Sequence, residues 1–202
     1  MPTSSTSPFP SRTRTFVREI LRFGTLVLGV TFARSSLADH YVVPSGSMEP
    51  TVHTGDRIVV DKRAYALRLP LTQVALARTG TVARGDVIVL ASPENGIVLL
   101  KRVVAVAGDD VEVRDGHVLR NGVPDDVAPA DLGLDRGGGP DFGPARVPAG
   151  SILVLGDHRG DSHDGRAFGW VTTDAVLGRA VAVVERDAAW TWRTLGSRSG
   201  RP

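Results

Sequence analysis

The sequence predicts a mainly β protein preceded by one N-terminal helix, and three observations support this fold class. From residue 41 onward, short runs rich in Val, Ile and Leu are separated by Gly, Pro or Asp, a pattern typical of strands and turns. The dipeptides Asp115-Gly116 and Asn121-Gly122 each lie beside such a run and favour tight hairpins, so antiparallel pairing is expected. No segment after residue 40 has a convincing helical period of apolar residues. The expected strands are residues 57–62, 86–90, 97–106, 110–114, 151–155 and 176–184.

The composition indicates one globular domain together with a targeting segment. The 202 residues are 42% hydrophobic and 23% charged, which is typical of a folded chain. The absence of cysteine excludes disulfides, a cysteine-based zinc site and a thiol nucleophile. Residues 41–185 hold 15 basic and 19 acidic side chains, and this mildly acidic balance argues against a nucleic-acid partner.

The N-terminus combines a polar segment with an apolar one. Residues 1–15 are rich in Ser, Thr and Pro and are expected to be disordered. Within residues 16–39, an uncharged run of 11 residues lies between Arg22 and Arg34. As a helix this run would span only about 16 Å, roughly half of a bilayer core. If the two arginines reach opposite head-group layers, residues 16–39 are long enough to form a membrane-anchor helix.

The arginines also predict the orientation of this helix. Arg12, Arg14, Arg18 and Arg22 precede the apolar run, so the positive-inside rule places the N-terminus in the cytoplasm and the β domain outside. Two alternatives remain open. One is a signal peptide that ends at Ser36-Leu37-Ala38 and is cleaved, which would also export the domain. The other is an interfacial or soluble helix.

The β domain is expected to comprise residues 40–186, followed by a basic tail at 187–202. One long stretch, 124–148, lacks a strand pattern and contains Gly137-Gly138-Gly139-Pro140. A stretch of this kind inside a compact domain is expected to be a flexible surface loop.

Ser47 is the first candidate for chemistry, because it lies in the restricted segment Pro44-Ser45-Gly46-Ser47-Met48-Glu49-Pro50-Thr51. Each proline fixes its own φ and restricts the preceding residue, and Gly46 lets a substrate carbonyl approach the backbone. A serine hydroxyl also needs a base that accepts its proton. No context singles out any of the five histidines, which are expected to be surface residues: His40, His53, His117, His158 and His163.

Lys101 is the stronger candidate for the base. The chain has two lysines against 22 arginines, and Lys62 lies between charged neighbours at a strand end, where it should stay solvated and charged. Strand alternation places Lys101 on the face of Leu99 and Val103. Burial there would lower the lysine pKa, and a neutral amine can act as a general base, which an arginine cannot. The alternative is an amine whose tip extends to solvent.

A third cluster of polar residues occupies positions 156–166, directly after an expected strand. Its His and Asp side chains could bind a metal, but two neighbouring arginines would repel a cation, so no metal is predicted. The other interpretation is support of the site, with Ser162 hydrogen-bonded to the base and Asp164 paired with Arg166 to fix the loop.

Four blocks of this chain resemble, in the same order, the bacterial type I signal peptidases (leader peptidases), which are membrane-bound serine proteases with a Ser/Lys dyad. The blocks are residues 44–51, 55–60, 101–109 and 156–166. Together they span roughly residues 40–185. The resemblance implies the coiled antiparallel β-sheets of this family. The fourth block departs from the family pattern at His158, Gly160, Asp161 and Gly165.

The resemblance also implies a role for each candidate residue. Ser47 would be the nucleophile and Lys101 the general base, and the Ser45 hydroxyl would join the Ser47 backbone N–H in the oxyanion hole. Ser162 would orient Lys101. Asp164 with Arg166 would stabilise the loop behind the base.

The implied function is a serine endopeptidase that cleaves N-terminal signal peptides from exported precursor proteins without a cofactor or metal. It would be a single-pass monomer of the bacterial cytoplasmic membrane, with the lipid bilayer and the precursors as partners and an extracytoplasmic catalytic domain. Precursors would bind as an added β-strand. Two alternatives remain open: a specialised peptidase of the same kind that processes one pilin or conjugation protein, and a non-catalytic exported β module.

Overall fold

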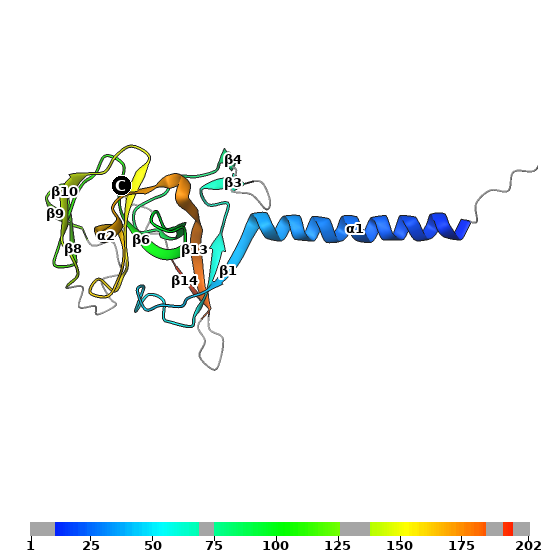
Figure 1. Cartoon of the computed structure of the whole chain (residues 1–202), viewed down its shortest axis with the longest axis horizontal. Coiled ribbons are helices and arrows are strands. Elements are labelled where there is room, and N and C mark those ends of the chain that lie inside the picture. Colours follow the sequence, from blue (N-terminus) through cyan, green and yellow to red (C-terminus); the bar gives the residue numbers. More distant parts are fainter. Residues whose placement is uncertain (1–10, 69–74, 126–137, 185–191, 196–202) are drawn as a thin grey trace, which may run out of the picture.

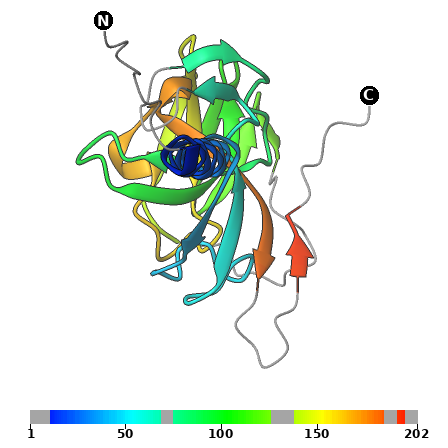
Figure 2. The ribbon, with the colours of Figure 1, turned by 90° about the vertical axis from the view of Figure 1, so that its right-hand side faces the viewer.

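The computed structural model describes residues 11–68, 75–125, 138–184 and 192–195. One long helix, α1 (Ser11–Leu37), projects away from a β domain, as Figure 1 shows. Viewed along its axis, α1 stands in front of the β domain (Figure 2). The described strands form sheets of eight, four and two strands. The mainly β fold class with one N-terminal helix is therefore confirmed.

The eight-stranded sheet carries the candidate residues. Its order is β1-β2-β13-β5-β6-β11-β12, with β14 beside β13 and every neighbouring pair antiparallel. Its strands are β1 (Ala38–Val42), β2 (Arg57–Asp61), β5 (Val87–Ala91), β6 (Val98–Val106), β11 (Ser151–Leu155), β12 (Val171–Thr172), β13 (Val176–Val184) and β14 (Trp192–Thr194).

Two smaller sheets and two short helices complete the described domain. The four-stranded sheet has the order β10-β7-β8-β9 and lies at the end of the domain away from α1 (Figure 1). Asp115 and Asn121 have φ values of 47° and 52°, as the predicted Asp-Gly and Asn-Gly turns require. The remaining elements are β3 (Ala66–Arg68), β4 (Ala75–Arg78), β7 (Asp110–Arg114), β8 (His117–Arg120), β9 (Val123–Pro124), β10 (Phe142–Arg146), α2 (Gly165–Phe168) and η2 (Thr173–Ala175).

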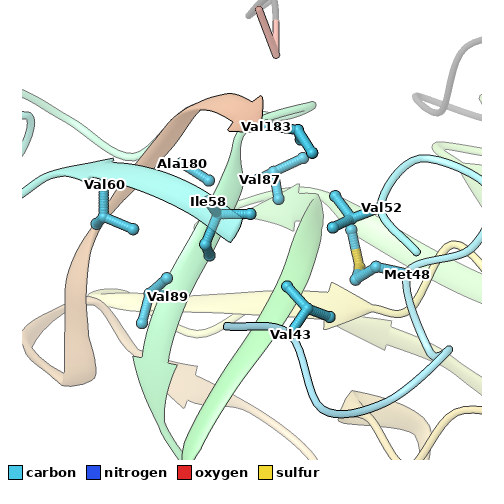
Figure 3. Close-up of a cluster of buried hydrophobic side chains, with 9 residues drawn as sticks. All are labelled: Val43, Met48, Val52, Ile58, Val60, Val87, Val89, Ala180 and Val183. Carbon is cyan, nitrogen blue, oxygen red and sulfur yellow. The ribbon is translucent and has the colours of Figure 1, made fainter. Parts of the chain in front are cut away.

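Buried apolar side chains connect the loop that carries Ser47 to the main sheet. Met48 and Val52 of this loop lie beside one another and pack with Val43 against side chains of β2, β5 and β13 (Figure 3). Both are almost fully buried, at 1% and 0% exposed. Burying such side chains stabilises the fold by about 1.5–3 kcal/mol each. The loop is therefore part of the core.

The six strands expected from sequence are all present, with bounds that differ by one residue at most. The N-terminal bounds differ more. Residues 11–15, expected to be disordered, belong to α1, and residues 38–39, expected to end the helix, begin β1. Residues 1–10 lie outside the described residues. Pairing of Ala38 with Asp61 of β2 explains the early helix end, because a strand partner satisfies its backbone.

Three other expectations were wrong in part. Residues 142–146 of the expected loop 124–148 form β10, which pairs with β7, whereas 126–137 lie outside the described residues. In the expected tail, β14 pairs with β13, whereas residues 187–191 and 196–202 lie outside the described residues. The one-turn helix α2 was not expected either. For β10 and β14, hydrogen bonds come from another strand, and for α2 they come from the N-cap side chain. The local sequence pattern does not reveal such partners.

None of the helices in the described part of the chain combines the length and the apolar character needed to cross a bilayer.

Candidate active site

Ser47 lies in the loop between β1 and β2, residues 43–56, which we call the nucleophile loop. β1 and β2 pair with one another, so the two ends of the loop lie close together. Backbone hydrogen bonds close its base and wind its middle into two turns: Val43 N to Asp56 O (2.9 Å), Gly55 N to Val43 O (2.8 Å), Glu49 N to Gly46 O (2.9 Å) and Val52 N to Met48 O (2.9 Å). Ser47 is thus held on ordered backbone at a half-buried position.

Lys101 reaches Ser47 from β6, 54 positions later in the sequence. Its Nζ lies 2.7 Å from the Ser47 Oγ, within hydrogen-bond distance. Lys101 is only 3% exposed, which excludes the alternative of an amine extended into solvent. The structure therefore brings the expected hydroxyl and amine together.

Burial lowers the pKa of Lys101 below its ordinary value of 10.5, because the ammonium loses its hydration. The negative charges of Asp164 and Asp157 oppose this effect, and the positive charge of Arg166 adds to it. Lys62 differs, because its Nζ lies 3.1 Å from a carboxylate oxygen of Asp39. The surroundings of Lys101 therefore shift it toward the neutral amine relative to a solvated lysine.

The loop after β11, residues 156–164, packs directly on Ser47. The backbone N–H of His158 donates to the Ser47 carbonyl oxygen at 3.1 Å. A Cβ at Gly156 would lie 2.5 Å from that oxygen and 2.2 Å from the Ser162 Oγ. Such distances are far inside van der Waals contact, so only glycine fits at position 156.

Ser162 lies in this contact but does not make the hydrogen bond to Lys101 that was expected. Its Oγ is buried and has no hydrogen-bond partner among the described residues. The Lys101 amine is instead directed at the Ser47 Oγ. A role of Ser162 in orienting the base stays a prediction.

Asp164 and Arg166 form the expected ion pair, and both side chains are fully buried. The two hydrogen bonds between guanidinium and carboxylate measure 2.9 and 3.0 Å. Asp164 also accepts from the backbone N–H groups of Gly156 and Arg166, and so caps α2. Arg166 donates to the carbonyl oxygens of Arg159 and Gly138 at 2.6 and 3.0 Å. The pair therefore holds both ends of the 156–164 loop.

A second buried ion pair, between Arg102 and Asp157, connects three parts of the site. No role was predicted for it from the sequence. Arg102, next to the base, donates to both carboxylate oxygens of Asp157 at 2.8 and 2.7 Å. The Thr51 hydroxyl, in the nucleophile loop, donates to the same carboxylate. All three residues are at most 4% exposed. An arginine in a buried apolar strand needs an acidic partner. The position of Arg102 in such a strand was therefore the sequence feature that could have predicted the pair.

An apolar groove of about 450 Å³ leads to Ser47 and Lys101. Ser45, which is exposed, lies on its wall together with Ser47 and Lys101. The other lining residues are Tyr41, Val42, Val43, Pro44, Met48, Ile58, Val89, Ile97, Val98, Leu99 and Leu100. A larger cavity of about 840 Å³, beside Tyr65 and β4, is lined by none of the candidate residues.

The histidines do not contact the Ser47 hydroxyl in the described structure. Four of them are exposed, and His158, which is half-buried, reaches Ser47 through its backbone N–H. His163 pairs with Glu94 at 2.8 Å on the surface. Within the described ranges, no three His, Asp or Glu side chains lie close enough together to hold a metal ion.

Comparison with known proteins gives the family. The model of the family described as signal peptidase, peptidase S26, matches residues 16–185. A crystal structure of a signal peptidase I from Enterococcus faecalis is 33% identical and covers 49% of this chain and 96% of its own, with a TM-score of 0.42. Signal peptidase I of Leptolyngbya laminosa is 34% identical over 168 residues, which cover 77% of this chain and 71% of that protein. Signal peptidase I P of Bacillus subtilis subsp. natto is 31% identical over 172 residues, which cover 79% and 85%. On the family match and these relatives, the chain belongs to the signal peptidase family, peptidase S26.

Proposed function

We propose that Ser47 and Lys101 form the catalytic dyad with which this chain cleaves signal peptides from exported precursors. Family membership identifies the chain as a serine endopeptidase of the signal-peptide-cleaving kind. One observation supports the assignment above all others: the 2.7 Å approach of the Lys101 Nζ to the Ser47 Oγ. The burial that lowers the Lys101 pKa favours the neutral amine.

In the proposed reaction, the neutral amine of Lys101 accepts the hydroxyl proton as the Ser47 Oγ attacks the scissile carbonyl carbon. The Ser47 backbone N–H and the Ser45 hydroxyl stabilise the oxyanion, and one such donor is typically worth about 3 kcal/mol in the transition state. The leaving amine of the substrate takes the proton from the Lys101 ammonium. The Lys101 amine, which is then neutral again, activates a water molecule that hydrolyses the acyl-enzyme.

The sheet edges around the groove suit a peptide bound as an added strand. β5 pairs with β6 from Val98 to Arg102, whereas β11 pairs with the other side of β6 only from Arg102 to Val106. Residues 98–101 therefore keep a free edge among the described strands. β1 is the terminal strand of the sheet, and its end lines the same groove. An extended precursor can donate and accept backbone hydrogen bonds there, with small side chains one and three residues before the cut.

We also propose that α1 anchors the enzyme to the bacterial cytoplasmic membrane as a monomer, with the N-terminus in the cytoplasm. The helix has 27 residues and is about 40 Å long. Arg22 is neutralised in part by an ion pair with Glu19 at 2.8 Å. Large apolar side chains of α1 are 48–69% exposed: Phe16, Val17, Ile20, Leu21, Phe23, Leu26 and Val27. A lipid surface would cover this area.

Substitution of the dyad tests the assignment. Ser47→Ala removes the nucleophile, and Lys101→Arg replaces the base by a group that keeps its proton. Each should lower cleavage of a purified precursor with an Ala-x-Ala site, in detergent, by at least about 10³-fold. Lys62→Arg, at the other lysine, should leave cleavage unchanged. Substantial cleavage by either dyad variant would exclude the proposed mechanism.

A further inference from the structure

The C-terminal strand β14 contacts the nucleophile loop. β14 pairs with β13 through Val183↔Arg193, and the Arg193 Nη2 donates a hydrogen bond to the Thr51 carbonyl oxygen. The two residues are 142 positions apart in the sequence. Arg193 therefore connects the last described strand with the segment that carries Ser47.

A second contact, from the residue that follows β14, supports the first. The backbone N–H of Leu195 donates to Val181 O at 2.9 Å, which extends the pairing beyond β14. The Leu195 side chain packs against the core cluster that contains Met48 and Val52, two residues of the nucleophile loop. One short segment thus makes a polar contact with the loop and an apolar contact with the core cluster to which the loop contributes.

Thr51 lies in the turn formed by residues 48–52, which directly follows Ser47. The Thr51 hydroxyl is held by Asp157, and Arg193 holds its carbonyl oxygen. The next residue, Val52, closes the turn through its hydrogen bond to Met48 O. Because Ser47 directly precedes Met48, a shift of Thr51 would be transmitted to the Oγ.

From these contacts we infer that Arg193 is a positioning residue, which keeps the nucleophile loop in the conformation that places the Ser47 Oγ beside Lys101. The inference rests on the proposed function of Ser47 and Lys101. It assigns to the C-terminal strand a part in catalysis that acts through the loop, without contact with the substrate.

Hydrogen exchange in a Ser47→Ala background tests the loop contact without any reliance on activity. Arg193→Gln should speed exchange of the Glu49 and Val52 amides by about tenfold, because these protons close the two turns of the loop. Amides of β5 and β6 should exchange as before. Trp192→Ala, at a 70% exposed neighbour on the same strand, is the matched control and should change neither.

Kinetics of otherwise unmodified enzyme give the second readout. Arg193→Gln should lower kcat about tenfold with KM unchanged, since a misplaced nucleophile affects the chemical step more than binding. Arg193→Lys should restore most of kcat, because an ammonium can also donate to the Thr51 carbonyl.

Unchanged loop exchange in Arg193→Gln would overturn the inference, as would faster exchange spread equally over β5, β6 and the loop. A protein in which Arg193→Gln loosens the loop, but whose Ser47→Ala variant still cleaves precursors, would overturn the proposed dyad and leave the loop contact standing.

Discussion

At the scale of single residues, the site depends on the choice of lysine at position 101. A buried arginine would keep its proton, whereas burial disfavours the charged form of a lysine and makes its lone pair available. The same strand places an arginine at position 102 and satisfies it with Asp157. In the proposed mechanism, two adjacent basic residues on opposite faces of one strand therefore have different tasks: Lys101 accepts a proton, whereas Arg102 keeps its charge.

The lowered pKa of Lys101 predicts the pH dependence of cleavage. The base works only when deprotonated, so kcat/KM should rise with pH and reach a plateau above the Lys101 pKa of the free enzyme. Because burial lowers this pKa, the midpoint should lie below 10.5. A pH–rate profile measured with a precursor in detergent checks this prediction. A rate that still increases through pH 10.5 without a plateau would contradict it.

At the scale of elements, two glycines mark places where backbone segments approach closely. Gly156 lies against the Ser47 carbonyl and Ser162, whereas Gly178 of β13 lies against β2, where a Cβ would be 2.7 Å from a methyl of Val60 and 2.8 Å from Asp61 O. Both positions exclude a side chain. They differ in what lies opposite, which is Ser47 for Gly156 and strand β2 for Gly178.

Alanine at these two glycines should therefore have different effects. Gly156→Ala should displace Ser47 and lower kcat on the order of 10²-fold. Gly178→Ala should reduce the free energy of unfolding by roughly 1–3 kcal/mol through overpacking and leave kcat per folded molecule nearly unchanged. Precursor cleavage and urea unfolding of both variants give the comparison. Equal losses of kcat in the two variants would show that the Gly156 contact is not specific to the site.

At the scale of the whole molecule, a long helix with exposed apolar side chains stands apart from a domain that has its own core. The described contacts of α1 with the β domain are concentrated at β1, and the helix extends away from the sheets (Figure 1). The helix leads directly into β1, whose end lines the groove. A membrane-bound α1 would hold the groove near the bilayer, where signal peptides are presented.

Charges on the apolar surface of α1 should release the enzyme from the membrane. Phe23→Lys combined with Leu26→Lys places two charges where each costs about 3 kcal/mol in a bilayer centre. The variant should move to the soluble fraction of cell lysates while it still cleaves precursors in detergent. Arg18→Lys, which keeps the charge, is the control and should stay with the membrane. Retention of the double variant in the membrane would contradict anchoring by α1.

Much of the fold could be predicted because strands in which apolar residues recur at every second position carry their own signal. The runs 110–114 and 176–184 are examples. The dipeptide Asp115-Gly116 likewise predicts a tight turn from its residue types alone. β10 and β14 lack such a pattern and form because β7 and β13 offer unpaired edges. An edge of this kind exists only after the rest of the sheet has assembled.

The candidate site divides in the same way. From sequence, Ser47 could be predicted as the nucleophile because prolines restrict its segment, and Lys101 as the base because a chain rich in arginine keeps a lysine inside an apolar strand at that position. The folded chain alone shows that the two meet at 2.7 Å, that Arg102 pairs with Asp157, and that Arg193 reaches Thr51. These contacts join residues 54 to 142 positions apart, and their distances depend on strand order and register and not on any local pattern.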